Sequence, residues 1–492
     1  MIPLSFAQQR LWFLHKFEGP SAAYNIPLAL NFDGSLNAGA LQAAIGDVLE
    51  RHESLRTIFT EIDGVGQQHI LQPDAVGSIF QIAPATDATL GELLREAVGY
   101  CFDLAREPPI RATLFRLGDT RHTLLLLVHH ICADGWSLAP LLRDLATAYT
   151  TRCRGQASSW APLPVQYADY TLWQREWLGE ESDPDSAIAA QIAFWKQTLA
   201  GLPEQIVLPA DRPRPTRASY RGAVLNFAIG AGVQKHLIEL VRSSQTSLFM
   251  VLHAAIAVLL SRLGAGTDIP LGTAIAGRTD DSLDDLVGFF VNTLVLRTDL
   301  SGNPSFRELL ARVRATDLAA YSHQDLPFER LVEIVNPARA ANHHPLFQVM
   351  LTLQNNAAPT MDLPGLAITG HAVDLPLVKF DLQFSFGESF ASDGAPQGIF
   401  GLIDYATDLF DRSTIESIAQ RLVRVLTAVA EAIDDPIGSI DLLGPDERER
   451  ILLDWNATTH PVADATLPEL FGQQVARTPD AVALVFEDAT LT

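Results

Sequence analysis

Two adjacent histidines end a run of apolar residues in the segment LLLLVHHICADGWS, which spans Leu124 to Ser137. Histidine is the side chain best suited to accept and return a proton near neutral pH. Successive residues of a β-strand point to opposite faces, so His129 and His130 cannot both face one site while the strand continues. We therefore expect one imidazole to pack among its neighbours and the other to face a cavity.

The same alternation argues against a metal ion shared by the pair. Zinc sites on strands favour HxH spacing and helical sites favour HxxxH, and no Cys or carboxylate cluster elsewhere completes a set of ligands. We predict no metal site. The residues alone leave two interpretations open. One is an acid-base site in which Gly135 lets a substrate approach the backbone; the other is a packed histidine pair in which Asp134 only caps the following helix.

Alternating strands and helices are predicted to position these histidines. HTLLLLVHH is typical of a strand covered on both faces, and NIPLALNFDG is a second strand. In LNAGALQAAIGDVLERHESLRTIF, Asn37 is the expected N-cap of a helix whose inner face is Leu41, Ile45, Val48, Leu49 and His52. After the turn, Ser137 is expected to cap a helix with the inner face Leu138, Leu141, Leu142, Leu145 and Tyr149.

The second half of the chain repeats this style without a repeat that can be aligned. A Pro-, Arg- and acid-rich connection lies between about Gly179 and Gly222. Beyond it, AVLNFAIG, FVNTLVLRTDL and LFQVMLTLQ are predicted strands, and SLFMVLHAAIAVLLSRLG and SFRELLARVRATDLAAYSH are predicted helices. The fold class is therefore α/β (α+β).

Composition narrows the partners. A formal net charge of -23 opposes binding to nucleic acid or to an anionic membrane surface. Cys101, Cys132 and Cys153 show no disulfide or CxxC pattern, and no secretory signal is recognised at the N-terminus, so a cytoplasmic location is expected. The most apolar helix contains His253 and Arg262 and is predicted to be a buried core helix, so no membrane span is expected.

Seven segments in order resemble the motifs of one family. HHICADGWS fits HHxxxDG, the core motif of condensation domains of nonribosomal peptide synthetases, in the chloramphenicol-acetyltransferase-like superfamily. The other six are LSFAQQRLWFL, RHESLRTIF, YADYTLWQ, VGFFVNTLVLR, HQDLPFERLV and HHPLFQVMLTLQN. The resemblance covers about Pro3 to Leu442, and the tail from Leu467 resembles the start of an adenylation domain.

The resemblance implies two chloramphenicol-acetyltransferase-like lobes in a V-shaped pseudo-dimer around a central tunnel. We expect residues 1–178 to form the N-terminal lobe and 179–442 the C-terminal lobe, with a linker at 443–466 and a truncated adenylation start at 467–492.

It also implies a reaction and its partners. Upstream donor and downstream acceptor peptidyl carrier proteins would each deliver a thioester on a 4'-phosphopantetheine arm, with no cofactor bound by the domain itself. The acceptor amine would attack the donor thioester to form a peptide bond. By position, His130 matches the catalytic histidine, His129 the first histidine of the motif, Asp134 the structural aspartate and Gly135 the glycine beside the thioester.

Other residues are assigned weaker roles. A buried Asp134 needs a partner, and the candidates are Arg56 and Arg297, each in another motif. Asn292 and Thr293 are candidates for substrate or pantetheine contacts, as are Trp136 and Ser137, although Trp136, like Tyr167 and Trp173, also fits packing. Cys132 is expected only to pack, and His129 to hold the turn by hydrogen bonding.

Several alternatives stay open. An L-donor, L-acceptor condensation subtype is favoured over a D-donor subtype. An epimerisation domain shares HHxxxDG, but its glycine tends to be followed by an order such as V-S-W rather than Trp136-Ser137. Heterocyclisation domains replace the histidines by aspartates. A free-standing acyltransferase that uses coenzyme A and a non-enzymatic carrier-docking platform are the remaining candidates.

Overall fold

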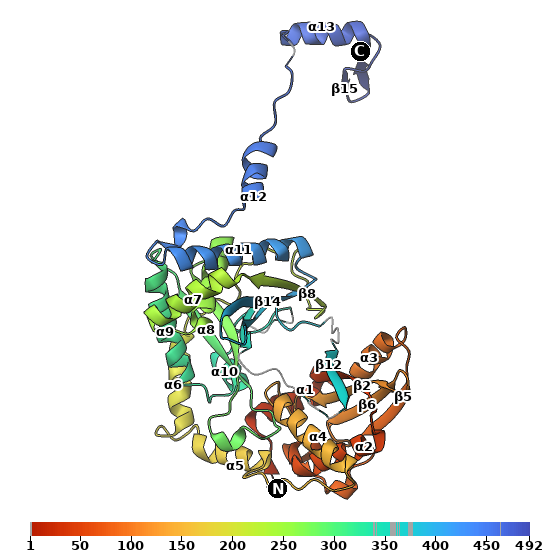
Figure 1. Ribbon diagram of the computed structural model, residues 1–492. Helices are drawn as coiled ribbons and strands as arrows, with labels where there is room; N and C mark the ends of the chain where they lie inside the picture. The colour runs from red at the N-terminus through yellow and green to blue at the C-terminus, as the bar shows by residue number, and fades with distance from the viewer. Residues whose placement is uncertain are drawn as a thin grey trace. The chain divides into compact units, whose positions relative to one another are not determined.

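The computed structural model describes residues 2–337, 340, 342–354, 361, 363, 365–371, 377–462 and 464–492. By its internal contacts the chain divides into a large unit, Met1–Asp441, and a small unit, Leu442–Thr492. Figure 1 shows that the large unit contains two groups of strands, each with its own helices.

A five-stranded sheet carries the histidine pair. Its order is β12-β2-β7-β6-β5, and the bounds are β2 Asn25–Gly34, β5 Phe80–Pro84, β6 Ile110–Arg116, β7 Arg121–His129 and β12 Leu366–His371. β7 is the central strand, antiparallel to β2 and β6, and all of its residues after Arg121 are buried. The continuous apolar run thus predicted this strand correctly, because a central strand has no solvent-facing side here.

The two predicted helices of this half are present and pack against each other. In α2 (Ala38–Arg51) the Asn37 side chain accepts a hydrogen bond from the backbone N–H of Ala40 at 3.0 Å, as its N-cap role predicts. α4 (Leu138–Cys153) buries Leu141, Leu142, Leu145 and Tyr149 of the expected inner face, whereas Leu138 is only partly buried. The hydroxyl of Ser137 makes no cap hydrogen bond to this helix, so its expected capping role is wrong. A further helix of this half is α3 (Leu90–Val98).

A six-stranded sheet forms the other half, in the order β10-β9-β11-β13-β14-β8. The strand bounds are β8 Gly222–Ile229, β9 Asp268–Ile275, β10 Asn292–Asp299, β11 Val349–Gln354, β13 Leu382–Phe390 and β14 Pro396–Ala406. Helices pack on it, namely α7 (Ala231–Ser244), α8 (Leu248–Leu260), α9 (Phe306–Tyr321) and α11 (Arg412–Glu431). These confirm the three strands and two helices predicted for this half; Asn355, at the end of one quoted motif, lies outside the described residues.

The most apolar helix lies in the core of this half. Every residue of α8 from Met250 to Leu260 is buried, and α8 packs against α7, α9 and α11. By length and composition the stretch Leu248–Ala265 is apolar enough to cross a membrane, and it is the one such stretch found in the described part of the chain. Its packing explains its composition, as predicted for a core helix.

One strand joins the two halves in a way that the sequence did not predict. β12 comes late in the chain, yet it pairs antiparallel with β2, from Leu366 opposite Gly34 to His371 opposite Ala29. In Figure 1 it is the cyan strand among the red and orange strands of the first half. The edge of the first sheet is therefore completed by the second half of the chain.

The remaining elements of the large unit connect these layers. A small sheet has the order β1-β4-β3, with β1 Ile2–Pro3, β3 Thr57–Ile62 and β4 Val65–Ile70. The connecting helices are α1 (Phe6–Glu18), α5 (Tyr167–Leu178), α6 (Ala187–Thr198) and α10 (Phe328–Val335).

The small unit has little secondary structure and no buried residue in its described elements. These are α12 (Pro445–Glu449), a helical turn at Arg450–Asp454, α13 (Leu467–Arg477) and the hairpin of β15 (Leu484–Phe486) and β16 (Ala489–Leu491). A helix followed by a strand was predicted for this tail, and both are present.

Gly272, in β9 of the second sheet, is predicted to be intolerant of any side chain. A Cβ there would lie 2.1 Å from the buried ring of Phe347. We expect Gly272→Ala to lower the free energy of unfolding by about 1–3 kcal/mol through overpacking. Urea denaturation measures this change. Gly46→Ala, at an exposed helical site with open space around the new Cβ, is the control and should be neutral or stabilising by about 0.5–1 kcal/mol. Equal unfolding midpoints for Gly272→Ala and wild type would contradict the prediction.

Candidate active site

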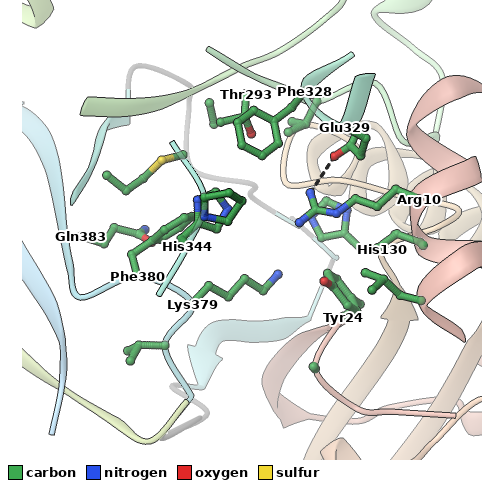
Figure 2. Close-up of a pocket in the computed structure, with 18 of the residues that line it drawn as sticks. Arg10, Tyr24, His130, Thr293, Phe328, Glu329, His344, Lys379, Phe380 and Gln383 are labelled. Atoms are coloured by element: carbon green, nitrogen blue, oxygen red, sulfur yellow. Dashed lines mark hydrogen bonds and ion pairs between the residues drawn. The ribbon is translucent and has the colours of Figure 1, made fainter. Parts of the chain in front are cut away.

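A cavity of about 900 Å³ lies between residues of the two halves of the large unit, and His130 lines it. Figure 2 shows the residues that converge there. Arg10 of α1, Tyr24 before β2 and His130 after β7 come from the first half; His344, Lys379, Phe380 and Gln383 come from the second. The cavity is large enough for a small-molecule substrate.

The two histidines have different surroundings, as the alternation of strand residues predicts. His129 ends β7 and is buried; its Nδ1 accepts a hydrogen bond from the backbone N–H of Ile131 at 3.1 Å, and its ring meets the edge of Phe102. The backbone N–H of His130 donates to the carbonyl of Tyr24 at 2.8 Å, and its ring packs against Phe289 with 4.6 Å between centroids. One imidazole holds the turn while the other faces the cavity.

The imidazole of His130 is neutral at physiological pH. Burial, with a smaller contribution from the positive charge of Lys379, lowers the pKa of His130 to about 3. Its Nδ1 has no hydrogen-bond partner, and no carboxylate of the described residues contacts the ring. A neutral ring without a carboxylate is a weak base, but it can accept a hydrogen bond from an amine and so orient it.

The carboxylate of Asp134 fixes the backbone on both sides of it through hydrogen bonds. Its Oδ1 accepts the backbone N–H of Ser137 at 2.9 Å and the Ser137 hydroxyl at 2.8 Å. Its Oδ2 accepts the backbone N–H groups of Phe290 and Val291 at 2.9 and 3.2 Å. Asp134 is fully buried, where an unpaired carboxylate would be costly, and these hydrogen bonds stabilise it.

The arginine beside Asp134 is Arg278, and the expectation of Arg56 or Arg297 was wrong. Nη2 of Arg278 lies 3.7 Å from Oδ1 of Asp134, and its guanidinium stacks over the ring of Phe290 at 4.2 Å. Arg56 instead binds Glu53 at 3.3 Å and nearby carbonyls, and Arg297 binds Asp268 at 2.7 Å. Both guanidinium groups are bound elsewhere, so neither pairs with Asp134.

Sequence analysis did not select Arg278, because this residue precedes the VGFFVNTLVLR motif and belongs to none of the seven segments. The loop from Gly277 to Val291 folds back on itself, and Arg278 donates to the carbonyls of Leu283 and Leu286. Gly277 has a φ of 66°, and a Cβ there would lie 1.9 Å from the carbonyl oxygen of Phe290. A glycine followed by an arginine, in the loop that leads into VGFFVN, was the available signal.

Asn292 and Thr293 line the cavity, but the amide of Asn292 is already used. Its Nδ2 donates to the carbonyls of Gln324 and Leu326, both at 2.8 Å, and its Oδ1 accepts the backbone N–H of Phe328 at 3.0 Å. The side chain therefore ties β10 to the start of α10. The structure does not support the expected substrate contact for Asn292 and leaves Thr293 as a lining residue.

The residues after Asp134 do not line the cavity. Gly135 is exposed with open space around it, and Trp136 is half-buried away from the cavity. The hydroxyl of Ser137 is buried and accepts the backbone N–H of Gly288 at 3.1 Å. None of the three lines the cavity with His130, so the expected position of Gly135 beside the thioester and the expected substrate contacts of Trp136 and Ser137 are wrong.

The packing residues are only partly as expected. Tyr167 is buried, and its hydroxyl donates to the carbonyl of Phe289 at 2.7 Å, whereas Trp173 is 46% exposed and stacks on Trp177. Cys132 is buried, burial raises the pKa of its thiol, and Sγ donates to the carbonyl of His129 at 3.2 Å. Cys132 thus has the packing role that was predicted.

Two charged residues of the cavity were not selected from the sequence. Arg10 forms an ion pair with Glu329 of α10 at 2.7 Å across the cavity wall, and Lys379 reaches in from the second half. Their positions along the chain gave no sign that they line one cavity. Among the described residues, no group of three or more His, Cys, Asp or Glu is arranged to hold a metal ion.

Comparisons with known proteins agree with this geometry. The condensation-domain family matches residues 1–452. A dimodular nonribosomal peptide synthase of Bacillus subtilis (strain 168) is 53% identical over 491 residues, which is 100% of this chain and 21% of that protein. The chain thus spans about a fifth of the length of this relative.

Solved structures share the fold. The X-domain in its complex with OxyB from teicoplanin biosynthesis is 38% identical, with a TM-score of 0.84 over 90% of this chain and 96% of that one. Holo-AB3403, a four-domain nonribosomal peptide synthetase bound to AMP and glycine, has a TM-score of 0.85 over 100% of this chain and 37% of that one; at 22% identity it supports the fold alone.

The ordered motifs, the two sheets around a histidine-lined cavity and the family match over residues 1–452 lead to one conclusion. This chain belongs to the condensation-domain family, the amide-forming domains of nonribosomal peptide synthetases.

Proposed function

We propose that this chain forms a peptide bond between a donor acyl or peptidyl thioester and an acceptor aminoacyl thioester, each carried on the phosphopantetheine arm of a carrier protein. The observation that carries the proposal is the position of His130, the second histidine of the HHxxxDG segment, at the wall of a cavity of about 900 Å³. The acceptor amine reacts in its neutral form, so a cavity that holds its base in the neutral form suits the reaction.

His130 acts mainly on the acceptor amine. An α-amine has a pKa near ~8, so a useful fraction is already neutral at pH 7. The neutral imidazole accepts a hydrogen bond from this amine, aligns its lone pair with the thioester carbon and takes its proton as the bond forms. Positioning of the two reactants then supplies much of the rate enhancement.

The finer assignments follow the motifs. The donor and acceptor carriers would approach different mouths of the cavity, and the L-donor, L-acceptor subtype is favoured by VGFFVNTLVLR and HHPLFQVM. The tail from Leu467 would begin an adenylation domain, and the reaction would occur in the cytoplasm, where the free thiols Cys101, Cys132 and Cys153 stay reduced.

A second candidate is a non-enzymatic docking platform. It is favoured by the similarity to the X-domain, which is seen in a complex with OxyB. The discriminating property is turnover, because a platform would bind its partners and form no amide bond.

The test mixes a donor-loaded carrier, an acceptor-loaded carrier and this chain, and follows the acceptor carrier by mass spectrometry. Wild type should add the donor mass to the acceptor carrier, and donors of each chirality separate the L- and D-donor subtypes. We expect His130→Ala to slow this reaction by at least about 100-fold, because the amine loses its acceptor and its orientation. His69→Ala, an exposed histidine of β4, is the control. An unchanged rate for His130→Ala would remove the assigned role.

The acid limb of the pH-rate profile should report the acceptor amine and not His130. With its pKa lowered to about 3, the imidazole stays neutral from pH 5 upward. The logarithm of the single-turnover rate should therefore rise with a slope of about 1 below pH ~8. An acceptor with a less basic amine should shift this limb to lower pH. A slope of 2 below pH ~6.5 would show instead that an ordinary imidazole titrates.

Asp134→Ala should disturb the fold as well as turnover. It leaves Arg278 buried without its ion-pair partner and frees the N–H groups of Phe290 and Val291. We expect a loss of about 3–5 kcal/mol in the free energy of unfolding, measured by urea denaturation, and a lower folding yield. Asp285→Ala, which breaks an exposed ion pair with Arg143, should cost less than about 1 kcal/mol. Equal costs for the two variants would contradict the structural role of Asp134.

A further inference from the structure

Lys379 places a positive charge in the cavity without an anionic partner. Its side chain lines the cavity, and its Nζ lies 4.4 Å from the centre of the Tyr24 ring. Among the described residues it forms no ion pair. Two carboxylates that also line the cavity have other partners, since Asp381 binds Arg214 and Glu329 binds Arg10. The Lys379 side chain is exposed and lines the cavity, and an unpaired cation in a cleft is a common property of functional charges.

The ammonium lies on the side of the cavity where the reaction is expected. The ring on which Lys379 stacks belongs to Tyr24, whose carbonyl accepts the backbone N–H of His130 at 2.8 Å. Its charge is close enough to lower the pKa values of both His129 and His130. In Figure 2 its Nζ points toward Tyr24 and His130 from the opposite half of the molecule.

The proposed reaction passes through one anion at its centre. The amine nitrogen bonds to the thioester carbon, the π pair of the C=O bond moves onto oxygen, and the nitrogen gives a proton to His130. The oxygen pair then re-forms C=O while the C–S bond breaks, and the sulfur leaves as the thiol with that proton. The thioester, the amine and the products carry no negative charge at the reacting atoms, so negative charge appears only in the tetrahedral intermediate.

We propose that the Lys379 ammonium stabilises the oxyanion of this tetrahedral intermediate. This inference rests on the proposed function, and it assigns His130 and Lys379 complementary tasks from opposite walls of the cavity. The neutral imidazole of His130 orients and deprotonates the amine. The ammonium of Lys379, from the second half, stabilises the negative charge that develops on the oxygen. Electrostatic groups that are aimed at such charge in a site shielded from water contribute strongly to catalysis.

The test compares Lys379→Met with Lys379→Arg in the carrier assay. Methionine keeps a similar length without charge, so kcat should fall by about 100-fold while KM for the loaded carriers stays within about twofold. Arginine keeps the charge and should recover a large part of the loss. Lys235→Met, at an exposed position of α7, is the control. Thermal unfolding of Lys379→Met should be close to that of wild type, because the exposed side chain forms no ion pair with the described residues.

The pH profile gives a readout that a structural role would not move. The protein atoms around the Lys379 ammonium partly desolvate it and, with the charge of Arg10, lower its pKa to about 8. The wild-type rate should therefore fall above this pH as the ammonium loses its proton. This falling limb should be absent in Lys379→Met and shifted beyond the measured range in Lys379→Arg. The charged or titratable groups around Lys379 are Arg10 of α1, Tyr24, His129 and His130 of the first half, and His344 before β11.

A binding measurement separates this inference from the proposed function. A pantetheinyl phosphonamidate carries negative charge where the tetrahedral oxyanion would lie, and calorimetry should show at least 10-fold weaker binding of it to Lys379→Met than to wild type. The neutral amide analogue should bind both equally. If Lys379→Met binds the phosphonamidate more weakly but wild type forms no peptide bond, the proposed function is wrong and the anion site at Lys379 stands. The role of Lys379 would be overturned if wild type turned over and Lys379→Met matched it in both rate and binding of the phosphonamidate. It would also be overturned if Lys379→Met lost rate only with substrates that have acidic side chains.

Discussion

The arrangement of the site depends on the hydrogen bonds that the buried carboxylate of Asp134 accepts. One of its oxygens holds the turn that follows His130, through Ser137, and the other holds the backbone of Phe290 and Val291 from the second half. A single buried charge therefore fixes the histidine turn and the crossing loop in one arrangement. Tyr167 and Ser54 add hydrogen bonds to the same loop, because their hydroxyls donate to the carbonyls of Phe289 and Val287. Groups of the two halves are held face to face as a consequence.

The electrostatics of the cavity follow from this arrangement. The carboxylate of the motif is spent on backbone N–H groups, so it cannot raise the basicity of His130 as the aspartate of a catalytic triad does for its histidine. Burial and a nearby cation both favour the neutral imidazole. The site thus suits a reaction in which orientation matters more than base strength, because an α-amine is already partly neutral near pH 7.

The sequence predicted local features well and long-range contacts poorly. The apolar run of β7, the Asn37 cap and the core helix α8 follow from periodicity and capping, which are properties of neighbouring residues. The packed His129 and the cavity-facing His130 follow from strand alternation. The partner of Asp134 did not, because Arg278 is distant along the chain and reaches the turn only through a folded loop. Lys379 was missed for the same reason, since only tertiary structure brings it to Tyr24.

The pairing of β12 with the first sheet affects how such domains can be recombined. The first sheet takes its outermost strand from residues 366–371, so residues 1–178 alone would leave the backbone groups of β2 unpaired along a long edge. Exposed edges of this kind invite association with other chains. A chimaera that joins the first half of one domain to the second half of another inherits a foreign edge strand with it. Compatibility between parents is therefore decided at the β2–β12 seam as much as at the cavity.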